Sequence, residues 1–475
     1  MLRLPASFTR TDTIALIVAS AFFMEVLDAT VIAPAIPHIA SDFGTSPASL
    51  SAGISAYLIT VAIFIPTSGW LADRFGVRTV FVTALSVFIL ASVWCGLSSS
   101  LPEFVVARVL QGIGGAMMSP VGRMEVMRRT PKERFMRAMA MVSWPGLSGF
   151  IVGPPLGGFF ATYMTWHWIF FINVPIGIVG LTLVLRYFTN ERAEPRPFDW
   201  AGFLLFGGGL GSLMAGLEIV GHGIADWRLG TGLIVLGATL GLAAIRHAVT
   251  ARHPLLSLAP LKMQTFAVGA FSAGNLFRLT IGASGFLFPT MFQIAFGMNA
   301  FDAGLLMLAF AVGDLAMKLR ATYFVRRFGL RPVLIVNGLL ATLAMAAIIL
   351  FTAQTPFWVM AVVLVVAGMF RSQQFTALGA MSFADIPPNG ISNATALSNM
   401  LQQVSFGLGV ALSAMLLVAS SLATGGDGAV LALFDFRVVV GAFTVLTLLS
   451  VLFFLRLPPD AGAAVSGHRK TADAQ

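Results

Sequence analysis

The chain has 475 residues, of which 57% are hydrophobic and only 10% charged, and its mean hydropathy is +0.88. This composition excludes a soluble domain and indicates an integral membrane protein. The single cysteine, Cys95, excludes an internal disulfide and any multi-cysteine metal site, and we expect neither a metal nor a cofactor.

Apolar runs of about 20 residues, the length that crosses roughly 30 Å of hydrocarbon, recur along the whole chain. They predict an all-α membrane protein with fourteen transmembrane helices. In chain order we expect these helices at 14–36, 50–72, 79–97, 101–122, 138–161, 167–188, 200–220, 229–247, 266–292, 302–322, 332–352, 356–377, 397–422 and 434–456.

The basic residues gather on one side of the predicted membrane. With the N-terminus inside, 23 of the 29 lysines and arginines fall in cytoplasmic segments. The positive-inside rule therefore explains the net charge of +9, and nothing supports binding to nucleic acid. We expect a multi-pass protein of the cytoplasmic (inner) membrane with both termini in the cytoplasm. The first apolar run is too long for a signal peptide and should remain as an anchor.

The chain contains an internal repeat. The stretch RFGVR at 74–78 returns as RFGLR at 327–331, an offset of 253, and Pro102 and Pro356 open equivalent spans at an offset of 254. We therefore expect a first six-helix half at 1–190, two inserted helices at 191–262, a second six-helix half at 263–457 and a disordered cytoplasmic tail at 458–475. Such repeats are typical of secondary transporters, whose binding site lies at mid-membrane between the halves.

Two acids lie inside the first predicted span. Glu25 and Asp28 are three residues apart and so share one helix face, with Glu25 near mid-membrane and Asp28 one turn further out. Because a carboxylate that faces lipid is very costly, both should face the interior or a water-filled cavity, where an acid can take up and release a proton. The alternative for each acid is a permanent structural ion pair.

Arg108 also lies deep in the membrane, in the fourth span, and Gln111 shares its helix face. An arginine does not deprotonate in proteins, so Arg108 cannot carry the proton itself. We expect it to bias the protonation of a nearby acid, and we place Gln111 with Glu25 and Asp28 in the substrate cavity. A purely structural Arg108 is the alternative.

The second half carries its own charges, with Asp314 and Lys318 in the tenth span and two arginines that have no acid nearby in the sequence, Arg278 and Arg371. Asp314 and Lys318, four residues apart, either neutralise one another or contribute to the substrate cavity. Arg278 is the repeat counterpart of Glu25, because 25 + 253 = 278. We therefore expect Glu25 and Arg278 to meet across the cavity.

Two further segments are candidates for gating. In the fifth span a glycine stripe, which includes Gly149, Gly153 and Gly157, allows close helix packing, and Pro154 should kink the helix. At the loop after the second span, Asp73 is expected to latch onto a helix start capped by Ser392 or Asn393. The alternative is that Asp73 is simply neutralised by Arg74.

Five motifs resemble those of the major facilitator superfamily, and two of them resemble signatures of its fourteen-span drug:proton antiporter branch. The resemblance implies the major facilitator fold, coupling or cation recognition by Asp28, proton transfer that involves Arg108, and gating by Asp73, Arg74, Arg78 and the glycine stripe. In the second-half copy of the loop motif, Arg326 replaces Asp73. The motifs are GWLADRFGVR (69–78), RVLQGIGGAMMSP (108–120), WPGLSGFIVGPPLGG (144–158), LDATVIAPAIP (27–37) and WHWIFFINVPIG (166–177).

These features favour a transporter and not an enzyme. We expect it to use the proton gradient to export amphipathic cationic or neutral drugs. The glycine-rich 207–211 lies inside an apolar span with no strand before it, so it does not predict a phosphate loop or ATP-driven pumping. The alternatives are a transporter of a dedicated metabolite or organic anion and a non-transporting sensor or scaffold. The expected partners are a small-molecule substrate, protons and the lipid bilayer, and we expect a monomer.

Overall fold

The computed structural model describes residues 10–130, 135–192, 197–221, 227–252, 254–387, 390–426, 428, 430–458 and 461–462, so most of the predicted tail lies outside the described residues. Every regular element in these ranges is helical. The first part of the chain forms α1 (Arg10–Val31), η1 (Ala33–Ala35), α2 (Ile36–Asp42), α3 (Pro47–Phe64), η2 (Ile65–Thr67), α4 (Ser68–Phe75), α5 (Val77–Leu97), α6 (Leu101–Arg129), α7 (Phe135–Tyr163), α8 (Trp168–Phe171) and α9 (Asn173–Tyr187).

The inserted helices and the second half follow in the same all-helical pattern. A short π-helical turn, η6, precedes the first long helix of the second half. These elements are α10 (Trp200–Gly221), α11 (Trp227–Thr250), η5 (Ala259–Lys262), α12 (Gln264–Phe266), η6 (Ala267–Phe271), α13 (Ser272–Ile294), α14 (Ala300–Phe328), α15 (Leu330–Ile349), α16 (Phe357–Phe383), α17 (Ile391–Ala423) and α18 (Leu433–Leu455).

All fourteen predicted spans coincide with helices. Twelve helical stretches within the described ranges are long and apolar enough to cross a membrane, and α7 and α13 occupy the positions of the predicted fifth and ninth spans. The first predicted span, 14–36, lies within one helical stretch, Thr11–Asp42, but this stretch is interrupted after Val31. Pro34 and Pro37 lie just after this point, and each lacks the amide hydrogen that a continuous helix needs, so η1 and α2 follow instead.

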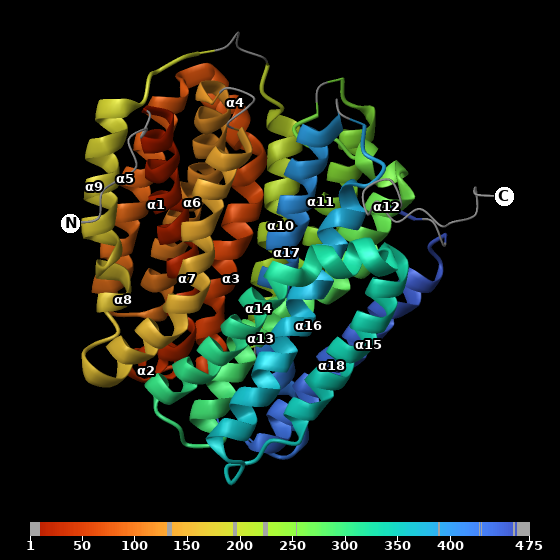
Figure 1. The fold of residues 1–475 in the computed structure, drawn as a ribbon. Helices are drawn as coiled ribbons and strands as arrows, with labels where there is room; N and C mark the ends of the chain where they lie inside the picture. Colours follow the sequence, from red (N-terminus) through yellow and green to blue (C-terminus); the bar gives the residue numbers. More distant parts are fainter. Residues whose placement is uncertain are drawn as a thin grey trace, which may run out of the picture.

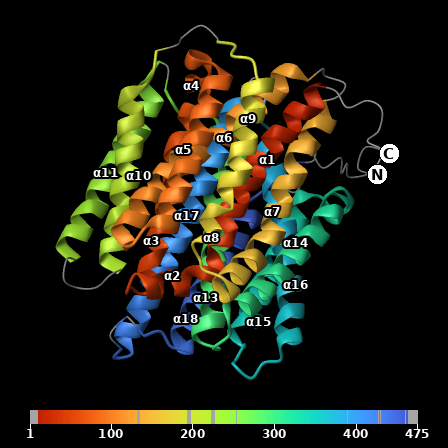
Figure 2. The ribbon, with the colours of Figure 1, turned by 90° about the vertical axis from the view of Figure 1, so that its left-hand side faces the viewer.

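The helices form two groups (Figure 1), with α1 to α9 in the first half and α13 to α18 in the second. Figure 2 shows α10 and α11 at one edge of the bundle, beside α3. Side chains from α3, α10 and α17 pack into one apolar cluster that contains Ile59, Met214 and Ala411. The insertion therefore contacts both halves through α10, while α11 packs mainly on α10 and has little buried surface.

The 253-residue repeat has a structural counterpart at the start of α5 and α15, which are the third membrane spans of their halves. Gly76 and Gly329 both have positive φ values, 90° and 83°, which glycine adopts without the steric cost of a Cβ atom. Two residues later, Arg78 Nη2 donates to the carbonyl of Leu185 at 2.7 Å, and Arg331 Nη2 donates to that of Leu455 at 3.1 Å. Each arginine thereby ties its helix to the C-terminal end of the last helix of the same half.

The two ends of the bundle differ in how the halves meet. We call the end with Arg74, Arg78 and Arg331 the basic end, and the end with α2 the opposite end. In Figure 1, α4, which carries Arg74, lies near the top and α2 near the bottom. At the opposite end one large apolar core contains residues of both halves. Gln293 Nε2 also donates to the carbonyl of Pro34 across the halves at 2.8 Å.

Toward the basic end, the two main cores each belong to one half. A smaller cluster there keeps α3 beside α17. The structure is therefore closed between the halves at the opposite end and has separate half-cores at the basic end.

Candidate substrate and proton sites

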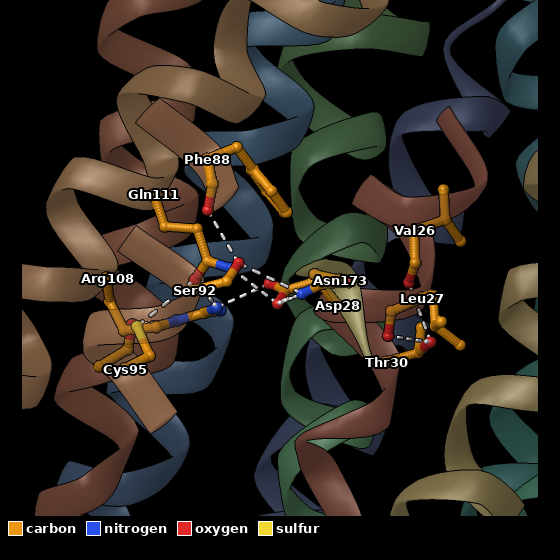
Figure 3. A network of polar contacts seen from close by, with 11 residues as sticks. Val26, Leu27, Asp28, Thr30, Phe88, Ser92, Cys95, Arg108, Gln111 and Asn173 are labelled. Atoms are coloured by element: carbon orange, nitrogen blue, oxygen red, sulfur yellow. Dashed lines mark hydrogen bonds and ion pairs between the residues drawn. The ribbon is translucent and has the colours of Figure 1, made fainter. Parts of the chain in front are cut away.

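Asp28 lies at the centre of a buried polar network in the first half (Figure 3). Its side chain has no exposed surface, and its Oδ2 is 2.6 Å from Nη1 of Arg108, which is equally buried. Its Oδ1 accepts hydrogen bonds from Gln111 Nε2 at 2.8 Å and from Asn173 Nδ2 at 2.9 Å. The carboxylate on α1 therefore joins α6 and α9.

A second layer of hydrogen bonds completes this network. Arg108 Nη1 also donates to Gln111 Oε1 at 2.6 Å. Ser92 Oγ on α5 accepts from Gln111 Nε2 at 2.8 Å and from Asn173 Nδ2 at 3.3 Å. Both amide groups thus have donors directed at Asp28 and at Ser92, and the four helices α1, α5, α6 and α9 are linked by one set of side chains.

The position of Arg108 follows from the close approach of α6 to α3. A Cβ atom on Gly112 would lie 2.9 Å from the backbone oxygen of Tyr57, so only glycine allows this distance between the helices without a shift. The guanidinium then lies 4.3 Å from the centre of the Tyr57 ring, in a cation–π contact. Arg108 is therefore held between an aromatic face and an acid.

The sequence identified Asp28, Arg108 and Gln111 but not Asn173, Ser92 or Tyr57. Asn173 lies within the quoted motif WHWIFFINVPIG, and a polar amide in an apolar span was the signal that could have found it. The placement of Asp28 and Gln111 in the substrate cavity does not match this structure, because helix packing leaves both side chains without exposed surface.

Glu25 is half-buried and lies outside this network. It accepts a hydrogen bond from Ser119 Oγ of α6 at 2.5 Å. Arg278, its expected partner, is almost fully buried and donates to the carbonyl of Ala270 in its own half at 2.9 Å. The structure thus does not bring Glu25 and Arg278 together, because their side chains bond locally, each within its own half.

In the second half Asp314 contacts two cations. Its Oδ1 is 3.2 Å from Nη2 of Arg371, and its Oδ2 is 3.6 Å from Nζ of Lys318. Arg371, which has no acid nearby in the sequence, thus gains one through tertiary packing, because α16 packs against α14 and brings it to Asp314. Arg278 joins neither this cluster nor the Asp28 network through any hydrogen bond or ion pair found in the described ranges.

The glycine stripe of α7 packs on α1 of the same half. A Cβ atom on Gly149 would lie 3.2 Å from the backbone of Leu27, and one on Gly157 would lie 1.8 Å from the carbonyl oxygen of Val31. A Cβ on Gly153 would likewise clash with Thr30. The stripe thus brings α7 onto the helix that carries Glu25 and Asp28.

The other face of α7 contacts the second half. A Cβ atom on Gly304 of α14 would lie 2.6 Å from the carbonyl oxygen of Pro154, and one on Gly158 would lie 2.3 Å from that of Ala300. Phe301 N also donates to Thr162 Oγ1 at 3.0 Å. On α7, Pro154 and Gly158, next to the stripe, thus contribute to the contact with the second half.

At the basic end, Asp73 pairs with Arg128 of the same half at 3.1 Å, on a partly exposed surface. The guanidinium of Arg74 instead lies over the ring of Trp70 at 5.6 Å. The predicted helix cap is wrong, because α17 begins at Ile391 after Gly390, which has no capping side chain. Neither the predicted latch nor the Asp73–Arg74 pair is found among the described residues, because Arg128 of α6 pairs with Asp73 instead.

The family model described as Major Facilitator Superfamily matches residues 18–409 and, in a second match, 270–473. Among curated proteins, the chain is 37% identical over 465 residues to the "Putative multidrug resistance protein MdtD" of Escherichia coli O127:H6 (strain E2348/69 / EPEC), and the alignment covers 97% of each chain. The protein of the same name from Cronobacter sakazakii (strain ATCC BAA-894) is also 37% identical, with 96% of each chain covered.

Solved transporter structures share the fold. An inward-facing, unoccupied bacterial homologue of the human lysosomal transporter Spinster matches with a TM-score of 0.66 at 15% identity, over 98% of this chain and 100% of that one. A D-xylose-proton symporter matches with a TM-score of 0.64 at 18% identity, over 95% and 98% of the two chains. At these identities the likeness establishes the arrangement of helices alone.

Proposed function

Because this chain belongs to the major facilitator superfamily, a family of membrane transporters, we propose that it is a proton-coupled antiporter that exports amphipathic small molecules across the cytoplasmic membrane. The observation that carries the proposal is the buried Asp28–Arg108 pair, linked by amide groups to four helices of the first half. Apolar residues of similar size stabilise a protein interior as well as a buried ion pair does, or better. A contribution to stability alone therefore does not account for this pair.

The coupling step follows from the bonds that Asp28 makes. A proton that binds Asp28 removes the negative charge that Arg108 contacts at 2.6 Å, and so weakens their interaction. The released guanidinium would then lose its charged partner in an apolar interior, which is costly enough to drive a rearrangement of α6 relative to α1. Glu25 lies one turn away and is partly exposed, so in this proposal it receives the proton before Asp28 does.

Gating in this proposal uses the two faces of α7. The stripe of Gly149, Gly153 and Gly157 holds α7 to α1, so a movement of α1 after protonation is transmitted to α7. The other face, with Pro154, closes the opposite end against α14. Asp73, Arg74 and Arg78 act at the basic end, where ion pairs and hydrogen bonds must exchange when the half-cores approach each other.

The positive-inside rule makes the basic end cytoplasmic, so the structure corresponds to a state closed toward the outside. Both termini are then cytoplasmic, and the protein functions as a monomer without a cofactor. Reporter fusions after residue 42 and at the C-terminus should therefore report opposite sides of the membrane. Reports from the same side would contradict this orientation.

The function is tested with purified protein in proteoliposomes under an imposed pH gradient. We expect gradient-driven movement of ethidium, a cationic amphiphile, together with proton flow in the other direction. Asp28→Asn should reduce this transport to background. The matched control is Asp302→Asn, which removes a partly exposed acid in the first turn of α14 that bonds locally to Asn299. Equal transport with and without the gradient would contradict coupling to protons.

A further inference from the structure

The second half contains a charge cluster with more cations than acids. Asp314 and Lys318 of α14 and Arg371 of α16 form it, with Asp314 within 3.6 Å of both cations. One carboxylate is thus shared by an ammonium and a guanidinium, which leaves one positive charge uncompensated. The described residues show no other acid paired with either cation.

The cluster borders a hollow between the two halves. Phe150 and Ile151 of α7 line the side of the first half, and Ala311 and Leu315 complete the apolar wall. The hollow is narrow in this structure, with a volume of about 10 Å³, which is room for about one water molecule. The side chains of Lys318, Arg371 and Asp314 are 32%, 21% and 19% exposed, in contrast to the fully buried Asp28 and Arg108. A larger molecule reaches the cluster only when α7 and α14 move apart.

The guanidinium of Arg371 is held in place and has donors to spare. It lies 4.5 Å from the centre of the Phe310 ring, in a cation–π contact that fixes its plane. Its Nε is buried and makes no hydrogen bond within the described part of the chain. Arginine in such a fixed position is suited to bind a carboxylate or sulfonate through two parallel hydrogen bonds.

The depth of the cluster makes the excess charge significant. Asp314 is fourteen residues from the first residue of α14, which is about 21 Å at 1.5 Å per residue. A net positive charge at this depth attracts an anionic group. It disfavours a cationic ligand, because the acid of the cluster is already shared by two cations.

We propose that this cluster binds the anionic group of an amphipathic substrate, while Phe150, Ile151 and Leu315 contact its apolar part. The inference rests on the proposed function, since it concerns what passes between the halves, and it predicts that molecules with a carboxylate or sulfonate are the preferred substrates among the amphipathic molecules exported. Asp314 acts as an internal competitor that occupies Arg371 and Lys318 when the substrate is absent. Bound substrate displaces Asp314 from Arg371.

The test uses three fluorescent probes that share one apolar group and differ in charge: dansylglycine, its neutral amide, and dansyl-ethylenediamine, which is cationic. Each is titrated into the full-length protein in lipid nanodiscs without a pH gradient. We expect dansylglycine to bind about tenfold more tightly than the amide, which is what one charged hydrogen bond contributes. We expect the cationic probe to bind least tightly.

Variants then assign the preference to the cluster. Arg371→Gln should abolish the difference between dansylglycine and its amide, whereas Asp314→Asn should tighten the binding of dansylglycine, because the internal competitor is gone. The matched control is Arg320→Gln, which removes an exposed cation from the same helix and should leave the preference unchanged. The tighter binding in Asp314→Asn cannot arise from a damaged fold.

Equal affinity of the wild type for the three probes would overturn the inference, and so would an unchanged preference in Arg371→Gln. Ethidium export in proteoliposomes reports separately on the proposed function. Export of ethidium without any preference for dansylglycine would refute only the anionic site. The predicted preference in nanodiscs without gradient-driven transport of any probe would refute the coupling and leave the site in place.

Discussion

The two halves share a backbone plan but use their buried charges differently. In the first half, Asp28 and Arg108 have no exposed surface, and amide groups engage the remaining oxygen of the acid. In the second half, Asp314 pairs with Lys318 and Arg371 beside a hollow, and all three remain partly exposed. The first arrangement is balanced and closed, and the second has an excess charge and is open.

This difference separates two tasks that a transporter must combine. A balanced pair sealed by hydrogen bonds is disturbed by a proton but not by a bulky molecule. An accessible cluster with excess charge can discriminate between substrates by charge. The repeat counterpart of Asp28 is Ile281, at 28 + 253, which carries no charge at all. The pseudo-symmetry therefore concerns the scaffold, and the chemistry is distributed asymmetrically over it.

The largest effect is expected in the closed network. Removal of one partner of a buried ion pair commonly costs about 3–5 kcal/mol, because the other charge is left uncompensated. Asp28→Asn and Arg108→Gln should each lower the thermal stability clearly and stop transport. The double variant Asp28→Asn with Arg108→Gln should recover stability but not transport. Additive losses of stability in this cycle would show that the two residues do not interact.

The adjacent glycines of α7 should have different effects, although both are crowded. Gly157→Ala inserts a methyl group against Val31 within the first half, and overpacking of this kind typically costs about 1–3 kcal/mol. Gly158→Ala inserts one against Ala300 of the second half and should open the contact between halves. Hydrogen exchange should therefore increase in α1 for the first variant and around 286–306 for the second. The same exchange pattern in both variants would contradict this division of α7 into two faces.

Asp314→Asn should change the free energy of unfolding much less than Asp28→Asn does. Its partners are partly exposed, and ion pairs in contact with water contribute about 1 kcal/mol or less. Thermal unfolding of both variants in the same detergent gives the comparison. A loss of stability in Asp314→Asn as large as that in Asp28→Asn would mean that the second cluster is also a closed structural network.

The smallest effects test the shared scaffold. Arg78→Ala and Arg331→Ala each remove a cation that donates to a carbonyl at a helix C-terminal end on an exposed surface. Such contacts contribute about 0.3–1 kcal/mol. We expect two small and equal decreases in melting temperature. A much larger decrease for one of them would show that the two junctions are not equivalent.

The arrangement of spans could be predicted because each depends on local composition. Fourteen apolar runs, the repeated RFGVR and RFGLR stretches and the prolines after Val31 are all present in the sequence, and each acts on the residues around it. The acids and the arginine in the membrane could be identified for the same reason, since charges in apolar runs are rare and costly. These properties do not depend on which helices later become neighbours.

The partners of those charges were decided by tertiary packing alone. The sequence predicted a pair between Glu25 and Arg278. In the structure, Asp28 pairs with Arg108, Asp314 with Arg371, and Asp73 with Arg128. Hydrogen bonds and ion pairs act over about 3–4 Å, and an error of one residue in helix rotation turns a side chain by about 100°. Periodicity and repeat symmetry therefore place a residue at a depth on a helix, but only the packed helices determine which side chain it reaches.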